Sequence, residues 1–95
     1  MMRQNLIELL SIHENPVDAV DAIVDYLEDI GLSLSDNGWL DGHLLDDLTT
    51  VIRKSPDLQK SALEILAHLD DCLALDGNGW LDDDPEAVSY INLNY

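Results

Sequence analysis

The sequence has few basic residues, one cysteine and no long apolar run, and each shortage excludes a class of protein. Four Lys and Arg residues in a chain of 95 are too few for direct nucleic-acid binding, because phosphate contacts depend on these side chains. Cys72 cannot form an internal disulfide, which is typical of a reducing compartment. The apolar runs fall short of the roughly 18 residues of a membrane span, and Glu8 interrupts the N-terminal one, which makes it a poor secretion signal. We therefore expect a cytoplasmic protein that binds neither nucleic acid nor membranes directly.

Acidic residues are abundant by comparison. Fifteen Asp and five Glu residues give the chain a formal net charge of −16. Self-repulsion at this charge density destabilises a compact state, so we expect the charge to serve a function beyond solubility. Glu would carry the same charge on a better helix former, whereas Asp holds its carboxylate closer to the backbone. The bias toward Asp predicts a surface of fixed negative charge and a basic or cationic partner.

Prolines and glycines mark the expected helix ends. The apolar fraction of 46% is too high for a disordered chain, and a chain of this length holds one core. Three prolines each follow a residue that caps helix N-termini, at Asn15-Pro16, Ser55-Pro56 and Asp84-Pro85. Asp41-Gly42 is a fourth expected start, and Gly31 is expected to end the second helix.

These signals predict an all-α protein, a small bundle of four to five short helices. The expected helices cover residues 3–13, 16–30, 42–54, 56–74 and 85–92. In the second of them, apolar residues recur on one side of the helix and acidic residues on the other. The tail 90–95 alternates apolar and polar residues, so a short C-terminal strand paired with 31–35 is the alternative there.

An internal repeat divides the single expected domain, 1–95, into halves of about 16–54 and 56–95. Residues 26–42 (YLEDIGLSLSDNGWLDG) align with 68–83 (HLDDCLALDGNGWLDD) when one gap is allowed. Two copies are too few for a solenoid, which needs about three or more. We expect two helix–loop–helix units packed face to face about a pseudo-twofold axis.

Evenly spaced acidic residues line the polar side of the second expected helix. Side chains three and four residues apart are neighbours on a helix, with Cβ atoms about 5–6 Å apart, and one DNA strand carries a phosphate about every 3.4 Å. Rows of Asp from two or three helices would approach that density and fit a groove that binds a nucleic-acid backbone. The expected partner-binding residues are Asp18, Asp21, Asp25, Glu28, Asp29, Asp46, Asp47, Trp39, Trp80, Asp82, Asp83 and Asp84. The alternative is a solvated acidic surface without a specific ligand.

The two Trp residues occupy equivalent places in the repeat, after Asn-Gly and before Leu-Asp. One interpretation is that Trp39 and Trp80 seal the end of the bundle. The other is that each is a partly exposed hot spot for binding, on which a basic partner stacks an Arg side chain.

The second repeat loop is similar to an EF-hand calcium loop over residues 76–86. With Gly79 at the turn position, the oxygen ligands would be Asp76, Asn78, Asp82 and Glu86. Two departures weaken the match, because Ala74 stands at the first ligand position and Pro85 at the twelfth. The sequence predicts no cofactor and no resident metal, and calcium at this loop is the alternative.

Signatures of an enzyme are weak. His13, His43 and His68 are scattered, no serine lies in a nucleophile elbow, and no glycine-rich phosphate loop follows a strand. A catalytic pair of carboxylates needs a cleft that drives the two pKa values apart, and so short a chain has little room for one. We predict that the protein is not an enzyme.

The sequence therefore predicts a non-enzymatic inhibitor that imitates nucleic acid and blocks a basic nucleic-acid-binding protein. In size and charge, the chain is similar to small acidic proteins that phages and mobile elements encode against restriction or CRISPR systems. A degenerate paired EF-hand module and an immunity protein against a basic nuclease toxin are the alternatives. Exposed Ile91, Leu93 and Tyr95 in the tail would support a homodimer.

Overall fold

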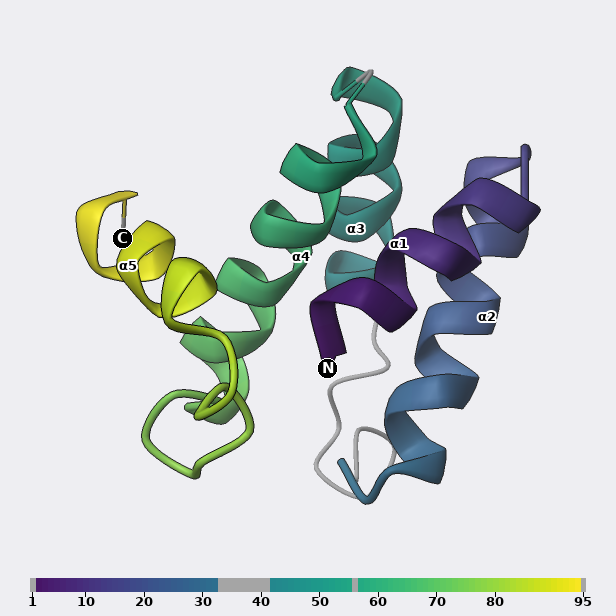
Figure 1. Ribbon diagram of the computed structural model, residues 1–95. Coiled ribbons are helices and arrows are strands. Elements are labelled where there is room, and N and C mark those ends of the chain that lie inside the picture. The colour runs from purple at the N-terminus through teal and green to yellow at the C-terminus, as the bar shows by residue number, and fades with distance from the viewer. Residues whose placement is uncertain (1, 33–41, 56, 95) are drawn as a thin grey trace.

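Five helices make up the computed structural model over the residues that it describes, 2–32, 42–55 and 57–94 (Figure 1). In chain order they are α1 (Met2–Ile12), α2 (Pro16–Asp29), α3 (Gly42–Lys54), α4 (Leu58–Leu73) and α5 (Pro85–Asn94). These ranges contain no strand, so the all-α prediction is confirmed. The alternative of a C-terminal strand is wrong, because the tail up to Asn94 belongs to α5. Most of its expected partner, 31–35, lies outside the described residues.

Hydrogen bonds confirm two of the three helix starts marked by proline. The side chain of Asn15 accepts from the Val17 amide at 2.9 Å, and Pro16 opens α2. Asp84, directly before α5, accepts from the Ala87 amide at 3.2 Å. Each side chain thereby satisfies one of the backbone N–H groups that a helix N-terminus leaves without a partner.

The start of α4 differs from the prediction. The helix begins at Leu58 instead of residue 56, and Asp57 caps it by accepting from the Gln59 amide at 2.9 Å. A charged acceptor makes a stronger hydrogen bond than the hydroxyl of Ser55 would make. Leu58 consequently lies in the first turn, where it is 38% exposed. The expected cap Asp41 and Pro56 lie outside the described residues.

Gly31 ends α2, as predicted, in a Schellman motif. Its φ of +106° is a conformation that glycine adopts without strain. The Gly31 amide donates to the Glu28 carbonyl at 3.1 Å, and the Leu32 amide donates to the Leu27 carbonyl at 3.0 Å. By contrast, α4 ends on Ala74, whose backbone is in the left-handed region at φ 51° although the residue is not a glycine.

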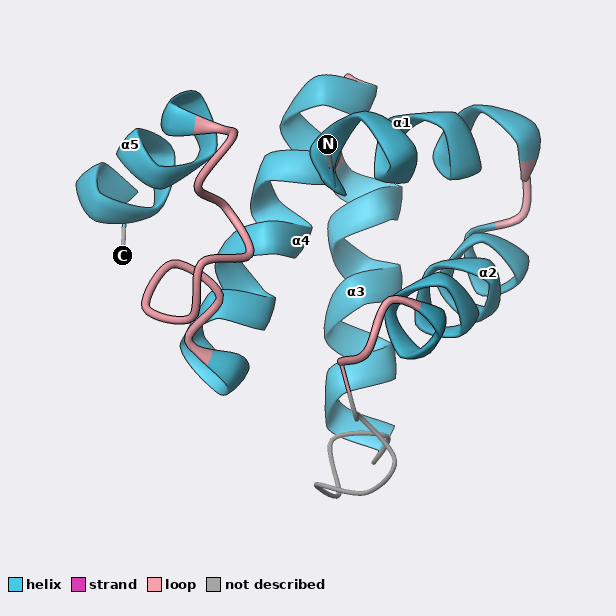
Figure 2. Ribbon diagram, turned by 60° about the horizontal axis from the view of Figure 1, so that its bottom comes forward, coloured by secondary structure: helices cyan, strands magenta, loops and turns pink. Residues whose placement is uncertain are grey.

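The central helix is α4, and three others, α1, α3 and α5, pack against it. Because α2 packs on α1 and α3 instead, α2 and α5 lie at opposite edges of the molecule (Figure 2). A single cluster of buried apolar side chains draws on all five helices. Its members include Leu6, Ile23, Leu48, Leu66 and Ala87. Within the described residues, each helix is too short or too polar to cross a membrane.

The apolar periodicity of α2 predicts its buried side correctly. Val20, Ile23 and Leu27 are almost fully buried, and Val24 is half-buried against the same core. In the tail the expectation of exposed apolar residues is wrong for Ile91, which is only 6% exposed because α5 packs on α4. Leu93 is 84% exposed, and Tyr95 lies outside the described residues.

Candidate acidic interface

Four aspartates form a row along the solvent side of α2. Asp18, Asp21, Asp25 and Asp29 are all exposed, and Glu28 beside them is partly exposed. Because α2 is one continuous helix of 14 residues, the row extends about 16 Å at a rise of about 1.5 Å per residue. We name these four aspartates the α2 row.

No described Lys or Arg forms an ion pair with the α2 row. Arg3 instead forms ion pairs with Asp84 and with Glu86, away from this row. The last turn of α2 also lacks a basic residue, although cations are favoured and anions disfavoured at the C-terminal end of the helix dipole. The charge of the α2 row is thus retained without local compensation, and it is available to a partner.

The neighbouring helix α3 adds to this acidic surface. Asp46 and Asp47 are both exposed, and α3 packs directly against α2. Between the two helices lies an open groove of about 480 Å³, lined among the described residues by Asp21, Val24, Asp25 and Leu45. Exposed carboxylates and half-buried apolar side chains therefore share one depression on the surface.

Sequence reasoning missed this groove. The apolar periodicity of α2 places Val24 on its core side, and Leu45 is not among the predicted binding residues. A signal was present, because each of these residues borders the apolar side of its helix and directly precedes an Asp, Asp25 and Asp46 respectively. The groove forms where the edge of the apolar side of α2 meets the corresponding edge of α3. That meeting depends on how the two helices pack, which the pattern of a single helix does not reveal.

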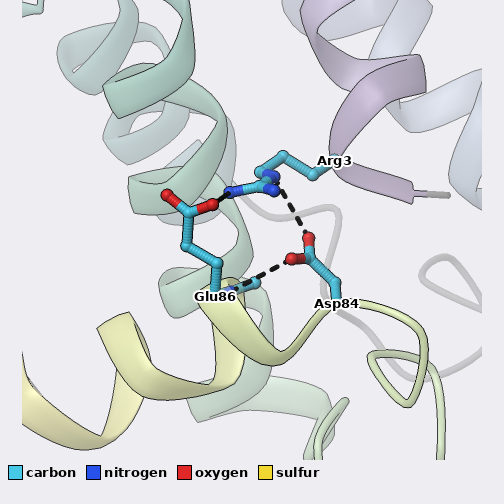
Figure 3. A network of polar contacts seen from close by, with 4 residues as sticks. Arg3, Asp84 and Glu86 are labelled. Atoms are coloured by element: carbon cyan, nitrogen blue, oxygen red, sulfur yellow. Dashed lines mark hydrogen bonds and ion pairs between the residues drawn. The ribbon is translucent and has the colours of Figure 1, made fainter.

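Asp84 does not lie on the exposed acidic surface, which corrects its predicted role. Its side chain is 2% exposed, and its Oδ2 lies 3.1 Å from Nε of Arg3 (Figure 3). Its other oxygen accepts the amide of Ala87 at the start of α5. Nη1 of Arg3 also pairs with Oε2 of Glu86 at 3.1 Å. Capping draws the Asp84 carboxylate into the protein, and the Arg3 guanidinium balances its charge there.

The other acidic and aromatic residues of the second loop have mixed surroundings. Asp82 and Asp83 are exposed, whereas Trp80 is partly buried against the core. A Cβ added at Gly31 would lie 3.8 Å from Cη2 of Trp80, so this ring packs beside the C-terminal end of α2. Trp39, the equivalent residue of the first repeat, lies outside the described residues.

The structure does not gather the residues that would form a calcium loop. The side-chain Nδ2 of Asn78 donates to the carbonyls of Leu73 and Ala74, at 3.3 and 2.9 Å, and so caps the end of α4. Glu86, the expected final ligand, pairs with Arg3. Over the described part of the chain, no three Asp, Glu, His or Cys residues are grouped to hold a metal ion. The expected ligands Asp76 and Asp82 are among the residues to which this applies.

No family model, curated protein or solved structure matches this chain.

Proposed function

We propose that the protein is a non-enzymatic inhibitor whose acidic surface on α2 and α3 occupies the nucleic-acid-binding groove of a basic protein. The observation that carries this proposal is the α2 row, four exposed aspartates in line on one rigid helix. Consecutive like-charged pairs of this spacing cost about 0.2–0.5 kcal/mol each. Three such pairs therefore oppose folding by roughly 1 kcal/mol, against a total stability of about 5–15 kcal/mol. A partner that neutralises the row explains why the charge is kept.

The charge distribution also suits rapid association. A surface of one sign steers an oppositely charged partner during diffusion, and salt weakens this effect. A restriction or CRISPR complex, whose groove binds a phosphate backbone, presents the matching field. An immunity protein bound to a basic nuclease toxin would use the same surface, so the two functions differ in the partner and not in the interface.

Affinity capture from a host lysate tests the proposal when three variants are compared. These are the unchanged protein, the charge reversal Asp18→Lys, Asp21→Lys and Asp25→Lys, and the control reversal Glu8→Lys, Glu14→Lys and Asp71→Lys. Both triple variants change exposed residues and shift the net charge equally. We expect the unchanged and control proteins to capture a nucleic-acid-binding protein at low salt, and added duplex DNA to displace it.

Retained capture by the α2 reversal at physiological salt would falsify the proposal, as would a captured partner that DNA does not displace. Far-UV circular dichroism of each variant verifies that the fold is intact. The captured protein, identified by mass spectrometry, distinguishes a restriction or CRISPR component from a nuclease toxin.

A further inference from the structure

We infer that the groove between α2 and α3 binds the side chain of an arginine from the partner, an inference that rests on the proposed function. The groove combines two chemical features that a diffuse acidic surface lacks. Asp21 and Asp25 supply carboxylates at its edge, and Val24 and Leu45 supply apolar surface. Arginine combines the complementary pair, a charged head and an aliphatic stem.

The two carboxylates are spaced for a planar, forked cation. Asp21 and Asp25 are four residues apart on α2, which places their Cβ atoms about 5–6 Å apart on one side of the helix. A guanidinium carries five N–H donors in a fixed fork and remains protonated. One arginine therefore donates to both carboxylates at once, whereas the ammonium of lysine is a point charge.

The apolar residues favour the same occupant. Val24 and Leu45 are partly buried and pack against the core, so their remaining exposed surface stays in a fixed position. The methylene groups of an arginine cover this surface while the guanidinium remains at the carboxylates. Guanidinium is also more weakly hydrated than ammonium, which lowers the cost of placing it in a partly apolar groove.

Other classes of occupant fit less well. A wholly apolar ligand would cover the carboxylates of Asp21 and Asp25 without providing a hydrogen-bond partner, which costs free energy. A hard divalent cation needs six or more oxygen ligands, and Val24 and Leu45 provide none from their side chains. An anionic ligand would be repelled.

Binding of two peptides of equal charge, deca-arginine and deca-lysine, tests the inference by titration calorimetry on the full chain. We expect the arginine peptide to bind roughly tenfold more tightly, because each charge-assisted bidentate contact adds to the charge attraction that both peptides share. The double variant Asp21→Asn and Asp25→Asn should lose this preference. Its matched control, Asp18→Asn with Asp29→Asn, removes the same charge from the same helix outside the groove and should keep it.

Val24→Thr tests the apolar surface at unchanged charge. We expect it to weaken the arginine peptide about fourfold, as for one lost methylene contact, and to leave the lysine peptide less affected. Equal affinities of the unchanged protein for both peptides, or equal losses in the two Asn double variants, would overturn the groove while leaving the acidic-surface proposal standing. The opposite outcome is also distinguishable. If the unchanged protein prefers the arginine peptide but the charge-reversed α2 variant still captures the partner from lysate, the groove stands and the proposed function is rejected.

Discussion

The carboxylates of Asp84 and of the α2 row belong to one residue type but have opposite surroundings. The side chain of Asp84 is almost fully buried beside the Arg3 guanidinium, whereas the α2 row is exposed and has no described Lys or Arg partner. A buried ion pair whose partner is removed leaves a charge without compensation, which costs far more than the loss of an exposed pair. Asp84 therefore contributes to stability, and the α2 row is free to contribute to binding.

Substitutions at Asp84 should separate its two structural roles. Asp84→Ala removes the cap of α5 and the buried partner of Arg3, which keeps only the exposed Glu86, and we expect it to lower the free energy of unfolding by about 3 kcal/mol. Asp84→Asn keeps a capping side chain, so it should lower the free energy of unfolding by about 1 kcal/mol less than Asp84→Ala does. Urea unfolding measures both values.

The exposed neighbour Asp83 provides the control for this comparison. Asp83→Ala should change the free energy of unfolding by no more than about 0.5 kcal/mol. A loss at Asp83 as large as that at Asp84 would show that general charge, and not the buried pair with Arg3, is responsible.

At the scale of the helix, the repeat explains why α2 and α4 end differently. The gap in the alignment falls opposite Gly31, so the second copy lacks the glycine that closes the first. α4 continues to Leu73 and then places Ala74 in the left-handed conformation. The Asn78 side chain bonds to the carbonyls at this end, which compensates in part for the missing glycine motif.

Exchanging glycine and alanine at these two ends should shift stability in opposite directions. Gly31→Ala should lower the free energy of unfolding by about 0.5–1 kcal/mol, because the strain of an L-residue at this positive φ, about 1–2 kcal/mol, exceeds the gain from a less flexible unfolded chain, about 0.4–1 kcal/mol. The added Cβ would meet Trp80 at an ordinary contact distance of 3.8 Å, so the loss comes from the backbone.

Ala74→Gly should raise the free energy of unfolding by about 0.5–1 kcal/mol. The relief of strain, about 1–2 kcal/mol, exceeds the cost of a more flexible unfolded chain, about 0.4–1 kcal/mol. Thermal unfolding of both variants against the unchanged protein provides the measurement, and a destabilised Ala74→Gly protein would contradict the argument.

Local patterns were sufficient to predict most helix boundaries but not the contacts between helices. Asn15 and Gly31 act through backbone groups a few residues away, so the sequence alone reveals their roles. Arg3 and Asp84 are far apart in the chain and meet only because α1 and α5 both pack on α4. For the same reason the sequence predicts the α2 row, a property of one helix, but not the groove that it shares with Leu45.

At the scale of the whole molecule, the charge opposes the fold that displays it. Apolar side chains from five helices supply one core, while a net charge of −16 acts against compaction. Salt should therefore act in opposite directions on this protein. It should stabilise the isolated fold by screening self-repulsion, and it should weaken the proposed complex by screening attraction.

Thermal unfolding at low and high salt tests the first effect. Between 0.01 and 1 M NaCl the Debye length falls from about 30 Å to about 3 Å. Screening the roughly 1 kcal/mol of repulsion within the α2 row alone should raise Tm by about 4–8 °C for a domain of this size.

The Asp21→Asn and Asp25→Asn double variant serves as the comparison for the salt effect. It removes every consecutive like-charged pair of the α2 row, so it should melt higher than the unchanged protein at low salt and converge with it at high salt. Parallel salt curves for the two proteins would show that repulsion in the row does not contribute to stability.

The placement of α2 and α5 at opposite edges has a practical consequence for experiments on this molecule (Figure 2). A fluorophore or a sensor-chip tether attached beyond α5 starts from the side of the molecule opposite α2, so it leaves the approach of a large partner to the α2 row unobstructed. The same attachment at the turn between α1 and α2 would stand beside Asp18 and would report steric hindrance as weak affinity.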